Sequence, residues 1–260
     1  MLNIDITEHE NKFKNYVAIE RKKELNDLTP IDLKYDHTMH VLNNAKEIVA
    51  QEHFSHEVSR AAVLAALYHD IARFEQYVRY HTFRDRESIN HGQFGVEILK
   101  QEGYLNSEDS WTINAVLQAI GLHNQYTLPD DLDKNVEIVA KVVRDADKLD
   151  ILRVMDAHLN SSKPYNPTVV LSLPDDQNLF SEVVINAALH DQVASYLDLK
   201  SVNDFCLLLA TWINDMNFES SRQQFIHQGH ALNILAKLPT TGHYAEARAY
   251  VWNKLQKRSN

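Results

Sequence analysis

The sequence predicts an all-α fold, and three features carry this prediction. Six Gly and six Pro among 260 residues favour long helices over frequent turns and hairpins. Apolar residues recur three and four positions apart, most clearly at Leu64, Leu67, Ile71 and Phe74, which is the spacing of an amphipathic helix. No segment shows a convincing strand pattern of alternating apolar and polar residues. We therefore expect a helical bundle with a helical extension at its C-terminal end.

The first 160 residues contain six expected helices, each with an apolar face. Their approximate ranges are 7–25, 37–52, 55–80, 91–103, 108–123 and 133–159. Thr29-Pro30 should interrupt helical structure between the first two helices, so His37 would lie at the start of the second helix. The helix over 55–80 is small or apolar nearly all round and should be buried. The polar segment after it, residues 81–90, has few helix signals and is expected to be a loop beside a site.

The second part of the chain follows a candidate linker. Residues 161–176 contain three prolines and little periodicity, whereas residues 178–257 again show helical spacing, enough for three or four helices. We therefore predict two domains. The first is a helical domain over residues 1–160, and the second is a helical subdomain over residues 161–260 that packs on it.

Charge and cysteine content restrict the partners and the compartment. A net charge of −10 makes a non-specific grip on a nucleic acid polymer unfavourable, although a few local Arg and Lys can still bind phosphates. The single cysteine, Cys206, allows no internal disulfide and fits a reducing cytoplasm. The N-terminal residues lack the pattern of a signal peptide, and the longest apolar run, residues 61–68, is too short to span a bilayer. We expect a cytoplasmic protein that does not associate with membranes.

A set of histidines and aspartates lies in or at the ends of the expected helices, next to apolar residues. Its members are His37, His69, Asp70, His91, His123 and Asp147. An ionised Asp in a buried helix costs several kcal/mol unless a metal ion, or an Arg from another helix, meets it. Neutral imidazole and carboxylate groups bind divalent Mn, Fe, Ni, Co or Zn, and a set without Cys argues against a structural zinc site. Each histidine taken alone is more often an ordinary core or surface residue than a ligand.

The order of these residues resembles that of a known family. His37 in HTMHV, His69-Asp70 in LYHDIARF and Asp147 in RDADKLD together resemble the HD-domain superfamily of metal-dependent phosphohydrolases, over about residues 30–155. His91 in NHGQFGVEIL and His123 in IGLHN resemble the additional ligands of its binuclear members. The GYP signature of cyclic-di-nucleotide phosphodiesterases is absent, which argues against that subgroup.

The resemblance implies a metal site for one or two ions. Its first ion would be held by His37, His69, Asp70 and Asp147. His91 and His123 would hold a second ion and share Asp70 with the first. Adjacent side chains on a helix point about 100° apart, so His69 and Asp70 can share one ion or let Asp70 bridge two.

The resemblance also implies hydrolysis of a small phosphate ester, such as a nucleotide, by a metal-activated water. We assign catalytic roles to Asp70, Arg73 and Lys148. Arg73 lies three and four residues after the two central ligands, so it should share their helix face and contact substrate phosphate, as should Lys148 and Arg144. Their alternative role is an ion pair with a nearby carboxylate, and the candidates are Glu75, Asp145 and Asp150.

Two rival functions remain open at this stage. Some enzymes of the superfamily use a similar ligand set as di-iron oxygenases, and the first ligand shell does not separate them from the hydrolases. The other rival is a nucleotide-sensing protein with a vestigial metal site, against which the complete ligand set argues. The sequence leaves the substrate, the native metal and a homo-oligomeric state undecided.

Overall fold

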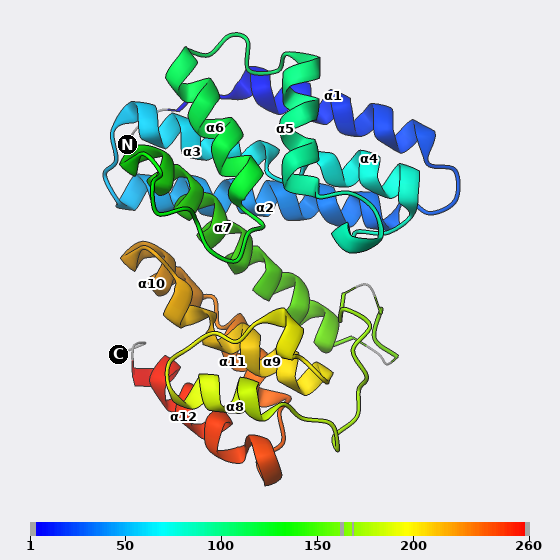
Figure 1. Ribbon diagram of the computed structural model, residues 1–260, viewed down its shortest axis with the longest axis vertical. Helices are drawn as coiled ribbons and strands as arrows, with labels where there is room; N and C mark the ends of the chain where they lie inside the picture. Colours follow the sequence, from blue (N-terminus) through cyan, green and yellow to red (C-terminus); the bar gives the residue numbers. More distant parts are fainter. Residues whose placement is uncertain (1–3, 162–163, 168, 258–260) are drawn as a thin grey trace. The chain divides into compact units, whose positions relative to one another are not determined.

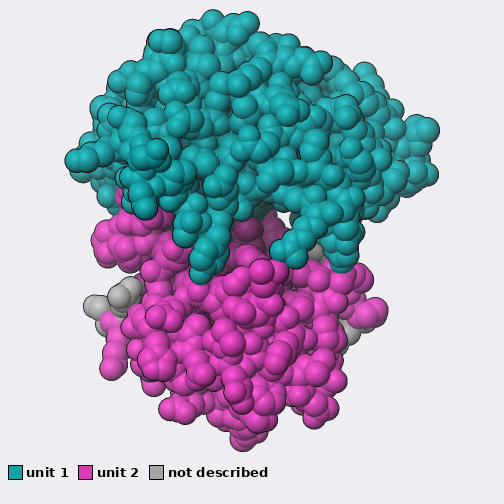
Figure 2. Space-filling view, in the orientation of Figure 1, with its two compact units in different colours: residues 1–150 teal, residues 151–260 magenta. Residues whose placement is uncertain are grey.

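Helices make up most of the computed structural model, which describes residues 4–161, 164–167 and 169–257. The described residues contain no strand, so the all-α prediction is confirmed. The chain divides into two compact units, residues 1–150 and 151–260, which Figure 2 shows in different colours. The predicted domain boundary at residue 160 stays a prediction. Within the described ranges, no helix combines the length and the apolar composition needed to cross a membrane.

The described residues of the first unit form seven α-helices and one short 3-10 helix (Figure 1). They are α1 (Thr7–Lys23), α2 (Thr29–Gln51), α3 (His56–Tyr68), α4 (Ile71–Tyr80), η1 (Asp85–Glu87), α5 (His91–Glu102), α6 (Ser110–Leu122) and α7 (Lys134–Leu159), the last of which ends in the second unit. The helix α3 packs against α2 and α6, and α5 packs against α4 and α6. Residues 61–68 of α3 are fully buried, as the sequence predicts, and α3 forms the centre of this unit.

The single helix expected over residues 55–80 is wrong, because the chain leaves the helix at His69-Asp70. Asp70 has φ −106° and ψ 17°, and α4 begins only at Ile71. The His69 ring bonds to the Ala66 carbonyl at 2.8 Å, an acceptor that a continuing helix would offer to the Asp70 backbone N–H. The break therefore places both side chains at a junction between two helices.

The start of α2 also differs from the expectation. Thr29 and Pro30 open this helix, because proline has a suitable φ and no N–H that needs a partner in the first turn. His37 consequently lies inside the helix, two turns from its start, and not at its beginning.

The second unit contains more helices than expected. Its α-helices are α8 (Glu182–Leu189), α9 (Val202–Thr211), α10 (Glu219–His227), α11 (His230–Ala236) and α12 (Ala245–Lys257). The helix α9 is buried at all but one of its positions and packs against α8, α11 and α12. The described part of the expected linker forms no helix, and its residues 162, 163 and 168 lie outside the described ranges.

Candidate metal centre

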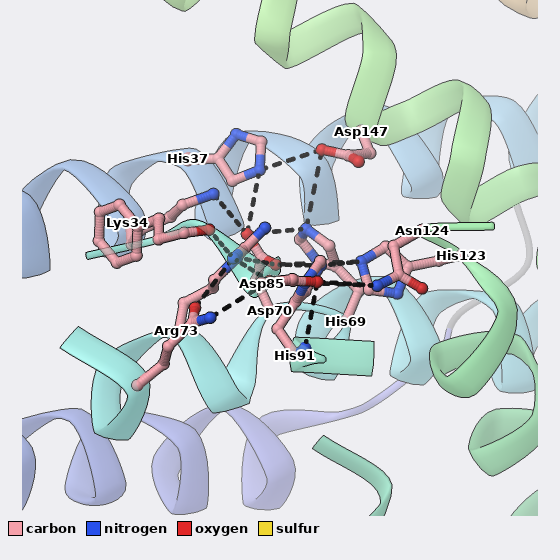
Figure 3. Close-up of polar contacts among 12 residues, drawn as sticks. Lys34, His37, His69, Asp70, Arg73, Asp85, His91, His123, Asn124 and Asp147 are labelled. Atoms are coloured by element: carbon pink, nitrogen blue, oxygen red, sulfur yellow. Dashed lines mark hydrogen bonds and ion pairs between the residues drawn. The ribbon is translucent and has the colours of Figure 1, made fainter. Parts of the chain in front are cut away.

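Five segments of the first unit bring the six predicted ligands together (Figure 3). His37 comes from α2 and Asp147 from α7, while His69 and Asp70 form the junction between α3 and α4. His91 is the first residue of α5, and His123 follows the last residue of α6. The polar atoms of these side chains converge on Asp70, although up to 110 positions of sequence separate them.

The first group of ligands surrounds one oxygen of Asp70. Its Oδ2 atom lies 3.6 Å from Nε2 of His37 and 3.6 Å from Nε2 of His69. Asp147 approaches the same two histidines, with Oδ1 at 3.1 Å from His37 Nε2 and 3.8 Å from His69 Nε2. These separations match those between atoms that share one cation, because a metal bond to oxygen or nitrogen is about 2.0 to 2.2 Å long.

The second group surrounds the other oxygen. Asp70 Oδ1 lies 3.5 Å from His91 Nε2 and 3.9 Å from His123 Nε2. The two carboxylate oxygens of Asp70 therefore face different pairs of histidines. This is the geometry of a carboxylate that can bridge two ions.

All four histidines form a hydrogen bond through Nδ1, which leaves each Nε2 facing Asp70. His69 Nδ1 lies 2.8 Å from the Ala66 carbonyl and His123 Nδ1 lies 2.7 Å from the Ile120 carbonyl, in each case three residues earlier in the chain. Because a carbonyl can only accept, each Nδ1 carries the hydrogen and each Nε2 presents a lone pair. Carboxylates do the same for the other two histidines: His37 Nδ1 meets Asp150 at 2.7 Å and His91 Nδ1 meets Asp85 at 2.6 Å. Such partners typically fix the ring orientation of metal-binding histidines.

The Nε2 atoms fit a cation better than they fit each other. Nε2 of His91 and Nε2 of His123 are 3.0 Å apart, and with both hydrogens on Nδ1 this places two lone pairs face to face. Nε2 of His69 is buried and makes no hydrogen bond to any described residue. A divalent ion bound by these atoms would satisfy the lone pairs, so the residues present fit the metal that the ligand order implies.

Burial and local charge favour the ionisation states that metal ligands need at His91, His123, Asp70 and Asp147, whereas Asp147 and Asp150 raise the pKa of His37 against the effect of burial. Burial lowers the pKa of His91 and the pKa of His123 to about 4, which keeps both imidazoles neutral near pH 7. Burial would raise the pKa of Asp70, but the positive charges of Lys34 and Arg73, with His69, hold that pKa well below its usual value. Burial would likewise raise the pKa of Asp147, but the neighbouring His37 holds that pKa below its usual value. Neutral imidazoles and ionised carboxylates are the metal-binding forms of these groups.

Arg73 lies beside the ligands, on the side of α4 that the sequence predicts. Its Nε is 3.4 Å from Asp70 Oδ1, and its Nη1 lies 2.9 Å from Asp85 Oδ1 and 2.6 Å from the Phe83 carbonyl. Glu75, the nearest expected alternative partner, pairs with Arg79 instead. Contact of Arg73 with a substrate phosphate stays a prediction.

The other two predicted basic residues have different surroundings. Arg144 donates to the backbone carbonyls of Gln125 and Tyr126, in the loop after His123. Its contact with a substrate phosphate stays a prediction. Lys148 follows Asp147 on α7 and is half-buried. Its catalytic role stays a prediction.

Sequence reasoning missed three residues of the centre. Lys34 Nζ lies 2.7 Å from Asp70 Oδ2, and Asp85 and Asp150 hold His91 and His37. Asp85 lies in the segment 81–90 that was expected to be a loop beside the site, and this was the only available signal for it. The sequence suggests Asp150 only as an ion-pair partner for a basic residue. No sequence pattern indicates a role for Lys34, because it precedes the expected start of the second helix.

Comparison with known proteins identifies the domain that carries this centre. Residues 35–160 match the family model of the HD domain. No curated protein and no solved structure matches the chain. The matched segment includes all six residues of the cluster, and HD domains bind divalent metals. The chain therefore carries an HD domain, the all-α domain of a superfamily of metal-dependent hydrolases.

Proposed function

We propose that the protein is a metal-dependent phosphohydrolase that cleaves a small phosphate ester, such as a nucleotide. The observation that carries this proposal is the double use of Asp70, whose two oxygens each face a separate pair of histidines. Such an arrangement suits one or two divalent ions, drawn from Mn, Fe, Ni, Co and Zn.

The roles of the ligands follow from the two groups. His37, His69, Asp70 and Asp147 would hold the first ion, and His91 and His123 would hold the second together with Asp70. When bound, the ions would lower the pKa of a bound water and offset charge on the phosphoryl oxygens. The protein contributes neutral, oriented Nε2 atoms and a carboxylate that stays ionised near pH 7.

Two cations beside Asp70 support a phosphate substrate. Lys34 Nζ lies 2.7 Å from Asp70 Oδ2, and its side chain keeps 20% of its surface exposed. Arg73 uses Nη1 for protein acceptors, whereas its Nη2 donates to no residue in the described ranges. The ring of Phe83 lies 5.6 Å from Lys34 Nζ and 5.9 Å from the Arg73 guanidinium carbon, so both cations border one aromatic surface. We assign phosphate contact to Lys34 and Arg73, and we retain Lys148 as a third candidate.

These cations also bear on the two rival functions. A di-iron oxygenase would need the same ligands, but it gains nothing from an ammonium group and a guanidinium group next to them unless its own substrate is anionic. A sensor with a vestigial metal site would not need the oriented Nε2 atoms of all four histidines.

Metal analysis and a substrate panel test the proposal. Protein purified without chelator should carry one or two transition-metal ions per chain. With Mn²⁺, Co²⁺ or Ni²⁺ added anaerobically, it should release inorganic phosphate or a nucleoside monophosphate from phosphomonoesters or phosphodiesters, and Asp70→Asn should abolish this release. Activity that strictly requires iron and consumes oxygen would refute the hydrolase assignment in favour of the oxygenase.

A further inference from the structure

The segment between α4 and α5 delivers a carboxylate to the second group of ligands. Asp85 Oδ2 lies 2.6 Å from Nδ1 of His91, and Asp85 Oδ1 lies 2.9 Å from Nη1 of Arg73 (Figure 3). The carboxylate thus joins a metal-site histidine to a guanidinium on α4. Oδ2 also accepts from Asn124 Nδ2 at 3.2 Å and from the His91 backbone N–H at 3.4 Å.

Further hydrogen bonds from α4 hold this segment in place. Gln76 is fully buried, and its Nε2 donates to Asp85 Oδ1 at 3.2 Å, to the Ser88 hydroxyl at 2.8 Å and to the Ile89 carbonyl at 3.0 Å. Arg73 also donates to the Phe83 carbonyl at 2.6 Å. The position of Asp85 therefore depends on two side chains of α4, and Arg73 provides the only charged contact of the two.

His91 differs from the other three histidines of the centre in the location of its hydrogen-bond partner. His69 and His123 bond to carbonyls of the helices that they terminate, and these carbonyls cannot shift without the helix. His37 bonds to Asp150, which lies on α7 and is 1% exposed. The partner of His91 lies on a surface segment instead, and the Asp85 side chain is 27% exposed.

We propose that Asp85 is a positioning residue that controls occupancy of the second ion position, and that Arg73 acts through it. In this arrangement Arg73 holds Asp85, Asp85 holds the Nδ1 hydrogen of His91, and Nε2 of His91 remains available to the ion. The inference deepens the proposed function at the same site. It rests on the two-ion arrangement and not on the class of reaction.

Asp85→Asn is the most direct test because of the donors around this carboxylate. Oδ1 accepts from the charged Arg73 at 2.9 Å and from Gln76 at 3.2 Å, whereas Oδ2 accepts from the neutral Asn124 Nδ2 at 3.2 Å and from the His91 backbone N–H at 3.4 Å. Because a charged donor binds an oxygen more strongly, the amide oxygen of the substituted side chain would occupy the Oδ1 position and its NH₂ group would face His91. An NH₂ group donates to Nδ1 and moves the ring hydrogen to Nε2, the atom that the ion needs. The substitution therefore preserves the shape of the side chain at position 85 while moving the ring hydrogen of His91 from Nδ1 to Nε2.

Titration calorimetry of the chelator-treated full-length chain with Mn²⁺ provides the readout. We expect the wild type to bind two ions, and we expect Asp85→Asn to weaken only the second by about 10- to 100-fold, the usual effect of removing such a partner. The matched control is Glu87→Gln, which removes one negative charge from the same turn at a side chain that pairs with Arg84. It should leave both affinities unchanged.

A second variant keeps the inference testable if Asp85→Asn does not fold. Arg73→Lys keeps the positive charge beside Asp70 and leaves Asp85 intact, but it removes the guanidinium that holds Asp85. It should also weaken the second ion selectively, whereas a residue that contacts only substrate would leave metal binding unchanged. Wild type that binds a single ion, or variants that weaken both ions equally, would overturn the inference. Loss of the proposed reaction class would appear separately, as two-ion binding without phosphate release.

Discussion

Low pH should destabilise the metal-free protein because its buried histidines resist protonation, and a substitution at His123 measures the contribution of one of them. Its pKa is lowered to about 4 by burial, against about 6.5 for an unfolded histidine. Between these two pH values the unfolded chain binds a proton that the folded chain does not, so the free energy of unfolding falls as the pH falls. From pH 7.5 to pH 4.5 the contribution of this one group is about 2.5 kcal/mol.

The substitution His123→Gln removes the titration and keeps a polar side chain of similar reach. We expect the drop in unfolding free energy between pH 7.5 and pH 4.5 to be about 2.5 kcal/mol smaller in the variant than in the wild type. Urea unfolding of chelator-treated protein, followed by far-ultraviolet circular dichroism at both pH values, measures it. Equal drops in wild type and His123→Gln would show that His123 is not held neutral in the folded protein, and the reasoning about the ligand state would fail.

Four further substitutions test the centre. His69→Ala should abolish metal retention, whereas His91→Ala should chiefly lose the second ion, as measured by elemental analysis of the purified variants; wild-type metal content in both would contradict the ligand assignment. Lys34→Gln removes a cation 2.7 Å from Asp70, so it should tighten Mn²⁺ binding in calorimetry while raising KM for the phosphate ester, and an unchanged KM would exclude Lys34 from substrate binding. Gly92→Ala would place a methyl group 3.0 Å from the Ile120 carbonyl that orients the His123 ring, so it should lower both thermal stability and affinity for the second ion.

The helices and the ligands were largely predictable, because both depend on local patterns. Spacings of three and four at Leu64, Leu67 and Ile71 predict a buried helix; Leu64 and Leu67 lie in α3, and Ile71 is the first residue of α4. The order of the six metal-site residues was sufficient to expect them together. Their convergence follows from helix ends and apolar faces that the sequence already displays.

The break at His69-Asp70 was not predictable from the same pattern. Apolar spacing continues through both residues, so periodicity alone extends one helix from residue 55 to residue 80. What ends α3 is a side-chain hydrogen bond from His69 to the Ala66 carbonyl, and hydrophobic spacing carries no information about such a bond.

The sequence by itself determined the all-α class and predicted the residues of the candidate metal centre. Only the tertiary structure decided which side chains support them. Asp150 lies 113 positions after His37, and Lys34 lies 36 positions before Asp70. Partners of this kind are selected by where helices cross in space, and the hydrogen-bonding capacity of Asp, Lys or Arg is the same at every position of a chain. For that reason a sequence can specify a donor set while leaving the orientation of each donor to the fold.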